Sequence, residues 1–276
     1  MGHRPDFFVR FWGVRGSIPC PGPDTVRYGG NTSCLEVRCD GRILILDGGT
    51  GLRLLDRALP DVSLDADVLF THTHLDHVNG WGFFRRLSDP RHRLDVWAGH
   101  LKPPHRIETV LARFLDDPLA PVHAGNVKAA LTYHDFAAGD SLAPRPGVSV
   151  RTAPLRHPNG ATGYRIEFDG RSICYVTDTE HVPGQPDAAI LGLIEGADIV
   201  IYDSTYTDAE FPRFLGWGHS SWQEGARLAE TARVKTFVAF HHDPNHDDTA
   251  MDAIAVALSR TRPGSIVARE GMVLRP

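Results

Sequence analysis

Four groups able to bind a metal ion fall within six consecutive positions of this chain: His72, His74, Asp76 and His77. They follow residues 67–70, Asp-Val-Leu-Phe, which we expect to form a short buried strand. A strand that ends in such a cluster delivers it to the end of a sheet, where open α/β folds place their sites. Because side chains alternate along an extended chain, we expect His72, His74 and Asp76 on one face and His77 elsewhere. One face can then serve one metal ion while the turn serves another.

Metal-competent residues also follow other apolar segments of the chain. We expect these segments to be buried strands, and they end at Asp47, His157, Asp178, Asp203 and His241. A single aspartate after a strand is often a turn former, which could account for Asp47 or Asp203 alone. That explanation does not cover the histidines. We therefore expect one edge of the structure to converge on one polar site, which Asp47 supports through hydrogen bonds to the metal ligands.

The segments that must position these residues alternate between strand-like and helix-like patterns. Strands are expected at residues 7–12, 34–39, 42–47, 67–70, 94–97, 148–153, 162–168, 172–176, 198–202, 235–240 and 265–268. Helices are expected at residues 52–59, 81–87, 105–115, 187–194, 222–232 and 248–259. Residues 117–134 and 140–146 are rich in turn signals, so we expect loops there. The long loop at residues 13–31, rich in glycine and proline, suggests a functional role.

Composition and charge exclude several classes of protein. The 276 residues carry a formal net charge of −5, which argues against a generic nucleic-acid-binding protein. No apolar run approaches the length of a membrane span, and no signal-peptide core follows residues 1–6. We therefore expect a cytoplasmic protein without a membrane partner. The four cysteines form no CxxC pair, so we expect free thiols.

The chain order of the candidate metal ligands carries a family resemblance. An HxHxDH motif followed by a later His, a later Asp and a later His resembles the metallo-β-lactamase superfamily of hydrolases. The residues that match this order are His72, His74, Asp76, His77, His157, Asp178 and His241. The resemblance covers almost the whole chain. It implies one α/β (α+β) domain over residues 1–276, a four-layer αβ/βα sandwich with two mixed β-sheets.

This resemblance also implies two divalent metal ions. It assigns His72, His74 and His157 to the first ion, Asp76, His77 and His241 to the second, and Asp178 to both. His242 competes with His241, which we prefer because it follows its strand directly and precedes a proline-containing turn. Imidazole and carboxylate ligands suit zinc, with manganese or iron as alternatives.

A further pair of motifs indicates the substrate class. Asp203-Ser204-Thr205 followed by Gly218-His219-Ser220 resembles a motif pair of the phosphodiesterase branch, which contains tRNase Z. In that branch an acidic residue orients a histidine that contacts the phosphate or protonates the leaving oxygen. By this resemblance His219 is the candidate acid and Asp203 its orienting partner, and the plainer alternative is that His219 caps a helix. The candidate catalytic residues are Asp76, Asp203 and His219.

Two departures from tRNase Z narrow the expected substrate. The long arm that clasps tRNA falls between the positions of His157 and Asp178, where this chain has room only for a hairpin turning at Asp169-Gly170. In addition, Asp203 stands where that relative has Glu. The segments at residues 13–19 and 28–33, with the His-His-Asp-Pro ending, instead resemble small bacterial phosphodiesterases that act on cyclic substrates.

The expected function is therefore a dinuclear metal-dependent phosphodiesterase with a metal-bridging hydroxide as nucleophile. We expect a small, cyclic phosphodiester as substrate, either a cyclic nucleotide or a sugar cyclic phosphate. The chain is expected to be a homodimer, with nucleic acid as a partner only if it is the substrate. The alternatives are an RNA or DNA end-processing nuclease, a lactonase or thioesterase, and a non-catalytic metal-binding regulatory module.

Overall fold

Two seven-stranded sheets organise the protein in this computed structural model, which describes residues 5–118 and 124–276. The strands are β1 (Phe7–Gly13), β2 (Cys34–Cys39), β3 (Arg42–Leu46), β4 (Asp65–Phe70), β5 (Arg93–Ala98), β6 (Ala130–Asp135), β7 (Ser141–Arg145), β8 (Val148–Leu155), β9 (Ala161–Phe168), β10 (Arg171–Val176), β11 (Ile199–Asp203), β12 (Thr236–Phe240), β13 (Ile266–Val267) and β14 (Val273–Leu274). The α-helices are α1 (Leu52–Ala58), α2 (Leu75–Val78), α3 (Ile107–Phe114), α4 (Ala188–Ile194), α5 (Trp222–Thr231) and α6 (Asp248–Thr261).

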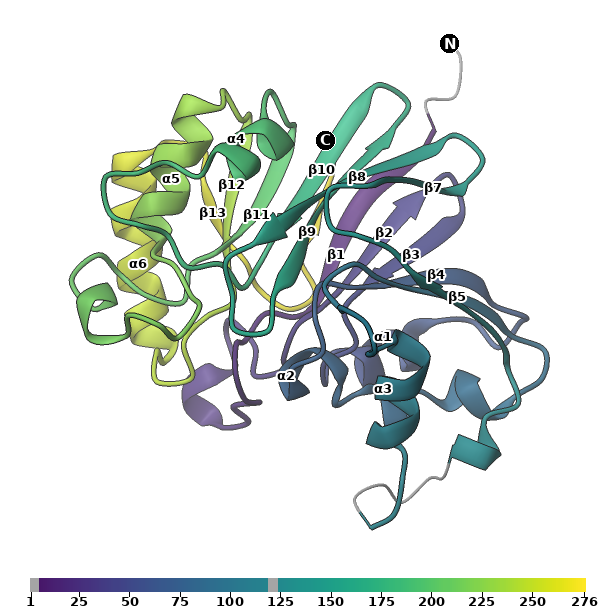
Figure 1. The fold of residues 1–276 in the computed structure, drawn as a ribbon. Helices are drawn as coiled ribbons and strands as arrows, with labels where there is room; N and C mark the ends of the chain where they lie inside the picture. The colour runs from purple at the N-terminus through teal and green to yellow at the C-terminus, as the bar shows by residue number, and fades with distance from the viewer. Residues whose placement is uncertain (1–4, 119–123) are drawn as a thin grey trace.

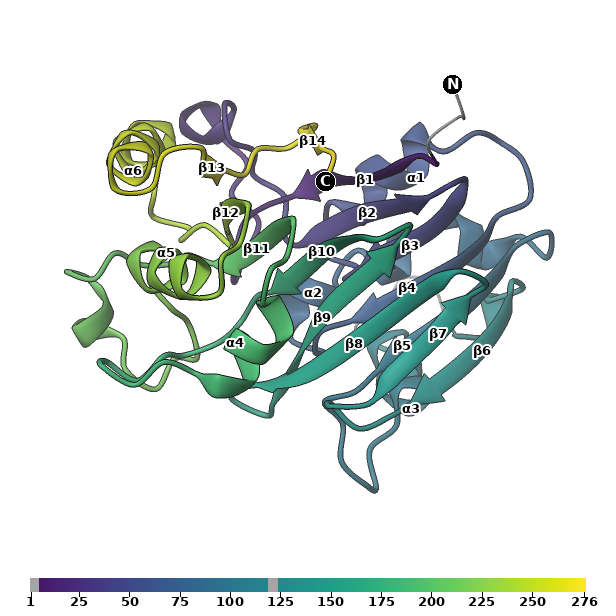
Figure 2. The same ribbon diagram turned by 90° about the horizontal axis from the view of Figure 1, so that it is seen from above.

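Both sheets are mixed, and each half of the chain builds most of one sheet. The first has the order β14-β1-β2-β3-β4-β5-β6, and the second has the order β13-β12-β11-β10-β9-β8-β7. In the first sheet the pairs from β14 to β3 are antiparallel and the pairs from β3 to β6 are parallel. In the second sheet the pairs from β7 to β10 are antiparallel and the pairs from β10 to β13 are parallel. Figure 2 shows the two sheets side by side from above.

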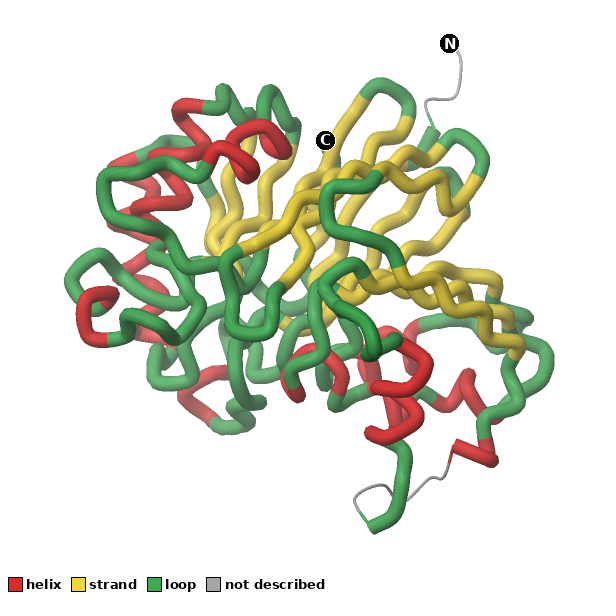
Figure 3. Tube along the Cα trace, viewed as in Figure 1, coloured by secondary structure: helices red, strands yellow, loops and turns green. Residues whose placement is uncertain are grey.

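The sheets pack face to face, and helices cover their outer faces. Phe11 of β1 and Phe240 of β12 meet between the sheets, with ring centroids 6.1 Å apart. Helices α1 and α3 bury their apolar sides against the first sheet, and α4, α5 and α6 cover the second. In Figures 1 and 3 the two groups of helices lie on opposite sides of the strands. This arrangement confirms the predicted four-layer αβ/βα sandwich with two mixed sheets.

Local signals in the sequence explain where several helices begin. The Ser221 hydroxyl accepts a hydrogen bond from the Glu224 N–H at 3.1 Å, so it caps α5. Asp187 caps α4 and Asp247 caps α6 in the same way. Such caps satisfy N–H groups that have no partner within the helix.

Four expectations about local structure were wrong. Residues 130–135 and 141–145, expected to be loop and turn, form the outer strands β6 and β7. They are half-exposed and polar, and therefore lack the apolar run of a central strand. Residues 81–87 form two 3₁₀ turns instead of one helix. The motif HTHLDH contains the short helix α2, which is too brief to show helical periodicity.

Residues 119–123, which belong to the expected 117–134 loop, lie outside the described residues. Among the helices that the structure describes, none combines the length and apolar character needed to cross a membrane.

Candidate metal centre

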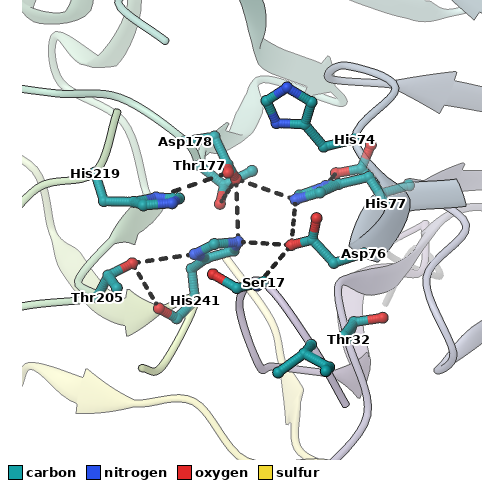
Figure 4. A network of polar contacts seen from close by, with 12 residues as sticks. Ser17, Thr32, His74, Asp76, His77, Thr177, Asp178, Thr205, His219 and His241 are labelled. Carbon is teal, nitrogen blue, oxygen red and sulfur yellow. Dashed lines mark hydrogen bonds and ion pairs between the residues drawn. The ribbon is translucent and has the colours of Figure 1, made fainter. Parts of the chain in front are cut away.

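The candidate site residues meet where six strands of the two sheets end. Asp47 follows β3, His72 and His74 follow β4, and Asp76 and His77 lie on α2. His157 follows β8, Asp178 follows β10, Asp203 is the last residue of β11, and His241 follows β12. Figure 4 shows several of these side chains around Asp178. The predicted convergence of strand ends on one polar site is therefore present in the structure.

The carboxylate of Asp178 lies between two sets of imidazoles. Its Oδ1 is 3.7 Å from His72 Nε2 and 3.6 Å from His157 Nε2. Its Oδ2 is 3.2 Å from His77 Nε2 and 3.3 Å from His241 Nε2. Each oxygen of one carboxylate thus faces a different pair of nitrogens, which is the placement required of a ligand shared by two metal ions.

The two sets of donors match two metal-binding groups. His72, His74 and His157 offer ligand atoms that all lie within 4.8 Å of one another, and His74 Nδ1 is 3.0 Å from His157 Nε2. The second group consists of Asp76, His77, Asp178 and His241.

Asp76 does not share a face with His72 and His74, contrary to our expectation, because the chain turns into α2 after His74. The carboxylate instead joins the second group, where its Oδ2 is 3.2 Å from His77 Nε2 and 3.4 Å from His241 Nε2. The Ser17 N–H also donates to this oxygen, so the long N-terminal loop reaches the site.

Hydrogen bonds to buried Asp47 orient the imidazoles of the HTHLDH motif. His77 Nδ1–H donates to Asp47 Oδ2 at 2.8 Å, and the Tyr175 hydroxyl donates to the same oxygen at 2.9 Å. The Thr71 hydroxyl donates to this carboxylate at 2.9 Å, so it must accept the hydrogen bond from His72 Nδ1–H at 3.1 Å. Both imidazoles therefore hold a proton on Nδ1 and direct Nε2 into the site.

The same logic applies to the other two histidines around Asp178. His157 Nδ1–H donates to the carbonyl oxygen of Gly218 at 2.8 Å. His241 Nδ1–H donates to the Thr205 hydroxyl at 3.1 Å, and that hydroxyl donates to Asp203 Oδ1 at 2.8 Å. Because a carbonyl or carboxylate oxygen can only accept, the protons are fixed on Nδ1 and the Nε2 atoms are free to bind a cation.

The donor set fits divalent metal ions. Among the residues that the structure describes, the buried Nε2 atoms of His72, His77 and His241 have no hydrogen-bond partner, whereas buried polar atoms are normally paired. Burial and the neighbouring imidazoles, His77 first, hold the pKa of His72 well below its usual range, which favours the neutral form that binds metals. Despite its burial, the pKa of Asp178 is also held well below its usual range by the adjacent imidazoles, His241 and His77 above all. Carboxylates and imidazole lone pairs thus meet in a small buried space, which is a favourable environment for divalent cations.

The geometry favours His241 over His242 as the last ligand. The His242 imidazole points away from the site, and its Nε2–H donates to the carbonyl oxygen of Ala268 at 2.9 Å. The ring packs edge-on against Tyr28 in the interior, with centroids 6.1 Å apart. Burial lowers the pKa of His242 to about 3, so this histidine is a neutral core residue.

Asp203 and His219 form an ion pair beside this centre. His219 Nδ1–H donates to Asp203 Oδ2 at 3.0 Å, and the same nitrogen is 3.7 Å from Asp178 Oδ1. Burial opposes protonation of His219, but the Asp203 carboxylate, then Asp178 and Asp76, outweigh it and raise the pKa of His219 to about 9. His219 lies near α5, but the cap of that helix is Ser221, so the helix-capping alternative for His219 is wrong.

Three of the residues at strand ends have a left-handed backbone. The φ angles are 60° at Asp47, 61° at Asp178 and 61° at His241. Non-glycine residues adopt this conformation at a cost, and they cluster at functional sites. The backbone at Gly16 also lies close to the His241 ring, because a Cβ added to Gly16 would be 2.4 Å from it.

Sequence reasoning missed several residues that surround the centre. Lys102, His100 and Asn159 line a cavity of about 620 Å³ together with His72 and His74. Lys102 and His100 lie in the connection between β5 and α3, and Asn159 follows His157 by two positions. Lys102 and His100 stand in no recognisable motif, so only the fold brings them to the site.

Comparisons with known proteins agree with this description. A family model described as a beta-lactamase superfamily domain matches residues 42–242, more than half of the chain. A ribonuclease Z from Mycobacterium marinum is 32% identical over 251 residues, which cover 82% of this chain and 83% of that protein. The zinc-bound PqqB from Methylobacterium extorquens has a similar fold, with a TM-score of 0.73, 20% identity and coverage of 98% of this chain and 100% of that one. A diphosphatase of the PhnP family gives a TM-score of 0.70 at 19% identity and covers 98% of both chains.

Proposed function

Because this chain belongs to the metallo-β-lactamase superfamily of metal-dependent hydrolases, we propose that it is a dinuclear phosphodiesterase for a small, cyclic phosphodiester, either a cyclic nucleotide or a sugar cyclic phosphate. One observation carries the proposal. The carboxylate of Asp178 lies next to the ion pair of Asp203 and His219, so a protonated imidazole stands beside the two groups of metal-competent residues.

The ligand assignment follows from the two groups of donors. We assign one ion to His72, His74 and His157, the other to Asp76, His77 and His241, and Asp178 to both. The nitrogen-rich donor set favours zinc, with manganese or iron(II) as alternatives. When bound, two such ions polarise the phosphoryl oxygens and supply a nucleophilic water at neutral pH.

His219 is the proposed proton donor to the leaving group. In the hydrolysis the water gives up a proton and its oxygen bonds to phosphorus, while the ester P–O bond breaks and the leaving oxygen takes a proton from His219. The proton released by the water balances the one that His219 supplies. An alkoxide is a poor leaving group, so a positioned acid contributes about 10²–10⁴-fold. Asp203 keeps His219 protonated and oriented through the 3.0 Å hydrogen bond.

The short connection between His157 and Asp178 supports a small substrate. It consists mainly of β9 and β10, which turn directly at Asp169 and Gly170. No arm extends from this hairpin to clasp a macromolecule. A nuclease acting on RNA or DNA ends is the second candidate, because the relative from M. marinum is named ribonuclease Z.

Hydrolysis of bis(p-nitrophenyl) phosphate tests the proposed activity directly. Protein loaded with zinc or manganese should release p-nitrophenolate, and removal of the metal by a chelator should abolish the reaction until metal is restored. Absence of phosphodiesterase activity in metal-loaded protein would refute the proposal. A panel of cyclic nucleotides, oligonucleotides, lactones and thioesters then separates the phosphodiesterase from the nuclease, lactonase and thioesterase alternatives. A non-catalytic metal-binding module would bind metal but turn over nothing in the panel.

We also propose that the protein is a homodimer. Large apolar side chains are exposed at Phe83, Leu215 and Trp217, which are 59%, 58% and 63% accessible. Leu215 and Trp217 lie two positions apart in one loop, and exposed apolar residues that gather in one place favour association. Light scattering after size-exclusion chromatography should give twice the mass of 30.4 kDa, and a monomeric mass at micromolar concentration would contradict this assignment.

A further inference from the structure

A groove extends from the candidate metal centre along the connection between β5 and α3. It consists of the cavity of about 620 Å³ beside His72 and His74 and an adjoining cavity of about 830 Å³. His100, Leu101, Lys102, His105 and Gly160 line both cavities, so the two cavities adjoin along this segment and make up the groove. We call it the Lys102 groove. Its far end is lined by Arg106, Phe136 and Pro154.

The charge in the groove is concentrated at Lys102. Its side chain is exposed, and it forms no ion pair or hydrogen bond with any other residue in the described ranges 5–118 and 124–276. By contrast, the Arg106 guanidinium is paired with Asp135 at 3.2 Å. Asn159 adds an amide near the centre, with Nδ2 3.3 Å from His74 Nε2. The groove therefore offers an unpaired ammonium group to an anion, although the chain as a whole has a net charge of −5.

The groove opens on a different side of the centre from the proposed acid. His219 and His74 lie on different sides of Asp178 in Figure 4, and the groove is lined by His74 but not by His219. A phosphodiester has two ester oxygens, and hydrolysis releases only one of them. If the leaving oxygen lies at His219, the other ester oxygen, which stays bonded to phosphorus, points toward the groove together with the part of the substrate that carries it, the retained half. In a cyclic phosphodiester the retained half stays joined to the leaving oxygen after hydrolysis.

We propose that the Lys102 groove binds the retained half of the substrate and that Lys102 contacts a second anionic group on it, most simply a phosphate. This inference rests on the proposed phosphodiesterase function and sharpens its substrate class. The substrate is then a phosphodiester that carries a further phosphate beyond the bond that is cleaved. Lys102 is a specificity residue in this proposal.

Two chromogenic nucleotides with the same leaving group test the proposal. One is the p-nitrophenyl ester of thymidine 5′-phosphate, and the other is the same ester with an additional 3′-phosphate. Both release p-nitrophenolate and retain the nucleotide, so they differ only in the second phosphate of the retained half. We expect the wild-type protein to prefer the phosphorylated ester in kcat/KM, mainly through a lower KM.

In Lys102→Ala this preference should fall by roughly tenfold, whereas Lys102→Arg should retain most of it. A tenfold change corresponds to about 1.4 kcal/mol. This value lies between the free energies that an exposed ion pair and a charge-assisted hydrogen bond typically contribute. Lys128→Ala is the matched control, because Lys128 is also exposed but lines neither cavity. That control should keep the wild-type preference. Added salt should weaken the preference in the wild type.

Equal kcat/KM for the two esters in the wild type, or an unchanged preference in Lys102→Ala, would overturn the proposal even if both esters are cleaved. Failure of the phosphodiesterase function itself would appear differently, as absence of turnover for both esters and for bis(p-nitrophenyl) phosphate. In that case a binding measurement still tests whether the groove holds a second phosphate. Calorimetry with the metal-loaded protein should show tighter binding of thymidine 3′,5′-bisphosphate than of thymidine 5′-phosphate, with the difference lost in Lys102→Ala. Equal affinities would overturn the groove assignment.

Discussion

Replacement of Asp203 by asparagine removes the partner of the proposed acid without changing the size of the side chain. Oδ2 of Asp203 accepts hydrogen bonds from His219 Nδ1–H and the Thr179 N–H, while Oδ1 accepts from the N–H and hydroxyl of Thr205. An amide has only one oxygen. Whichever way the asparagine is turned, its NH₂ group meets donors that the carboxylate accepted. In Asp203→Asn we therefore expect His219 to lose its negative partner and its proton.

The size of the effect follows from the hydrogen bond that is lost. A buried hydrogen bond to a charged group contributes about 1.5–3 kcal/mol. If the transition state loses the same free energy, kcat for a substrate with an alkoxide leaving group decreases roughly ten- to 150-fold. His219→Ala removes the acid itself and should slow hydrolysis of such a substrate by about 10²–10⁴-fold.

The leaving group supplies the decisive comparison. p-Nitrophenolate is a stable anion and departs without a proton, whereas the alkoxide released from a cyclic nucleotide needs one. Asp203→Asn should therefore slow hydrolysis of a cyclic nucleotide that the wild type cleaves, and slow bis(p-nitrophenyl) phosphate much less. Metal content must be measured alongside, because Asp203 also contacts His241, a proposed metal ligand, through Thr205. Equal slowing of both substrates at full metal content, or less than about a threefold effect on the cyclic nucleotide, would refute the role of His219 as an acid.

Three other substitutions test the support around the centre. The pKa of His242 is about 3 in the fold and about 6.5 when unfolded, so the unfolded state binds the proton first and stability falls as the pH drops below 6.5. Between pH 7.5 and pH 5 the wild type should lose up to about 2 kcal/mol of unfolding free energy because of His242, and His242→Gln should not show this loss. Denaturant titrations measure it, and an equal pH dependence in the two proteins would contradict the prediction. Asp47→Ala should weaken metal binding by about 10–100-fold in a competition titration, because His77 loses its orienting carboxylate, whereas wild-type affinity would rule that support out. Gly16→Ala should displace the His241 ring, which a Cβ would approach to 2.4 Å, and lower the metal content below that of the wild type, so a full complement would show that the ring tolerates the methyl group.

The sequence predicted the central strands and the residues at their ends because the signals there are local. Apolar runs such as residues 42–46 and 236–240 are buried on both faces, and a charged or imidazole residue marks the point where each leaves the sheet. The sandwich fold itself was implied by the family resemblance that the chain order of His and Asp carries, and these runs are compatible with it. The same reasoning brought Asp178 and His241 to one site, and the structure places their side chains 3.3 Å apart.

What the sequence did not predict depends on contacts between distant segments. The outer strands β6 and β7 are half-exposed, so their residues carry no apolar pattern. Helix α2 spans four residues, and its presence rather than strand alternation moves Asp76 from the face of His72 to the second group of ligands. Lys102 reaches the neighbourhood of the site only because α3 packs beside β5.

At Asp47, Asp178 and His241 the left-handed backbone sets the stability of the fold against retention of the site, because substitutions that relieve the strain also remove the site residues. Each of these residues holds a conformation that costs of order 1–3 kcal/mol and that glycine adopts freely. A library selected for heat resistance alone should therefore accumulate glycine or asparagine at these three positions and lose the metal site. A library selected for turnover should keep the costly residues and gain its stability elsewhere. Thermostable descendants of this protein that remain active should thus carry their stabilising changes away from the ends of β3, β10 and β12.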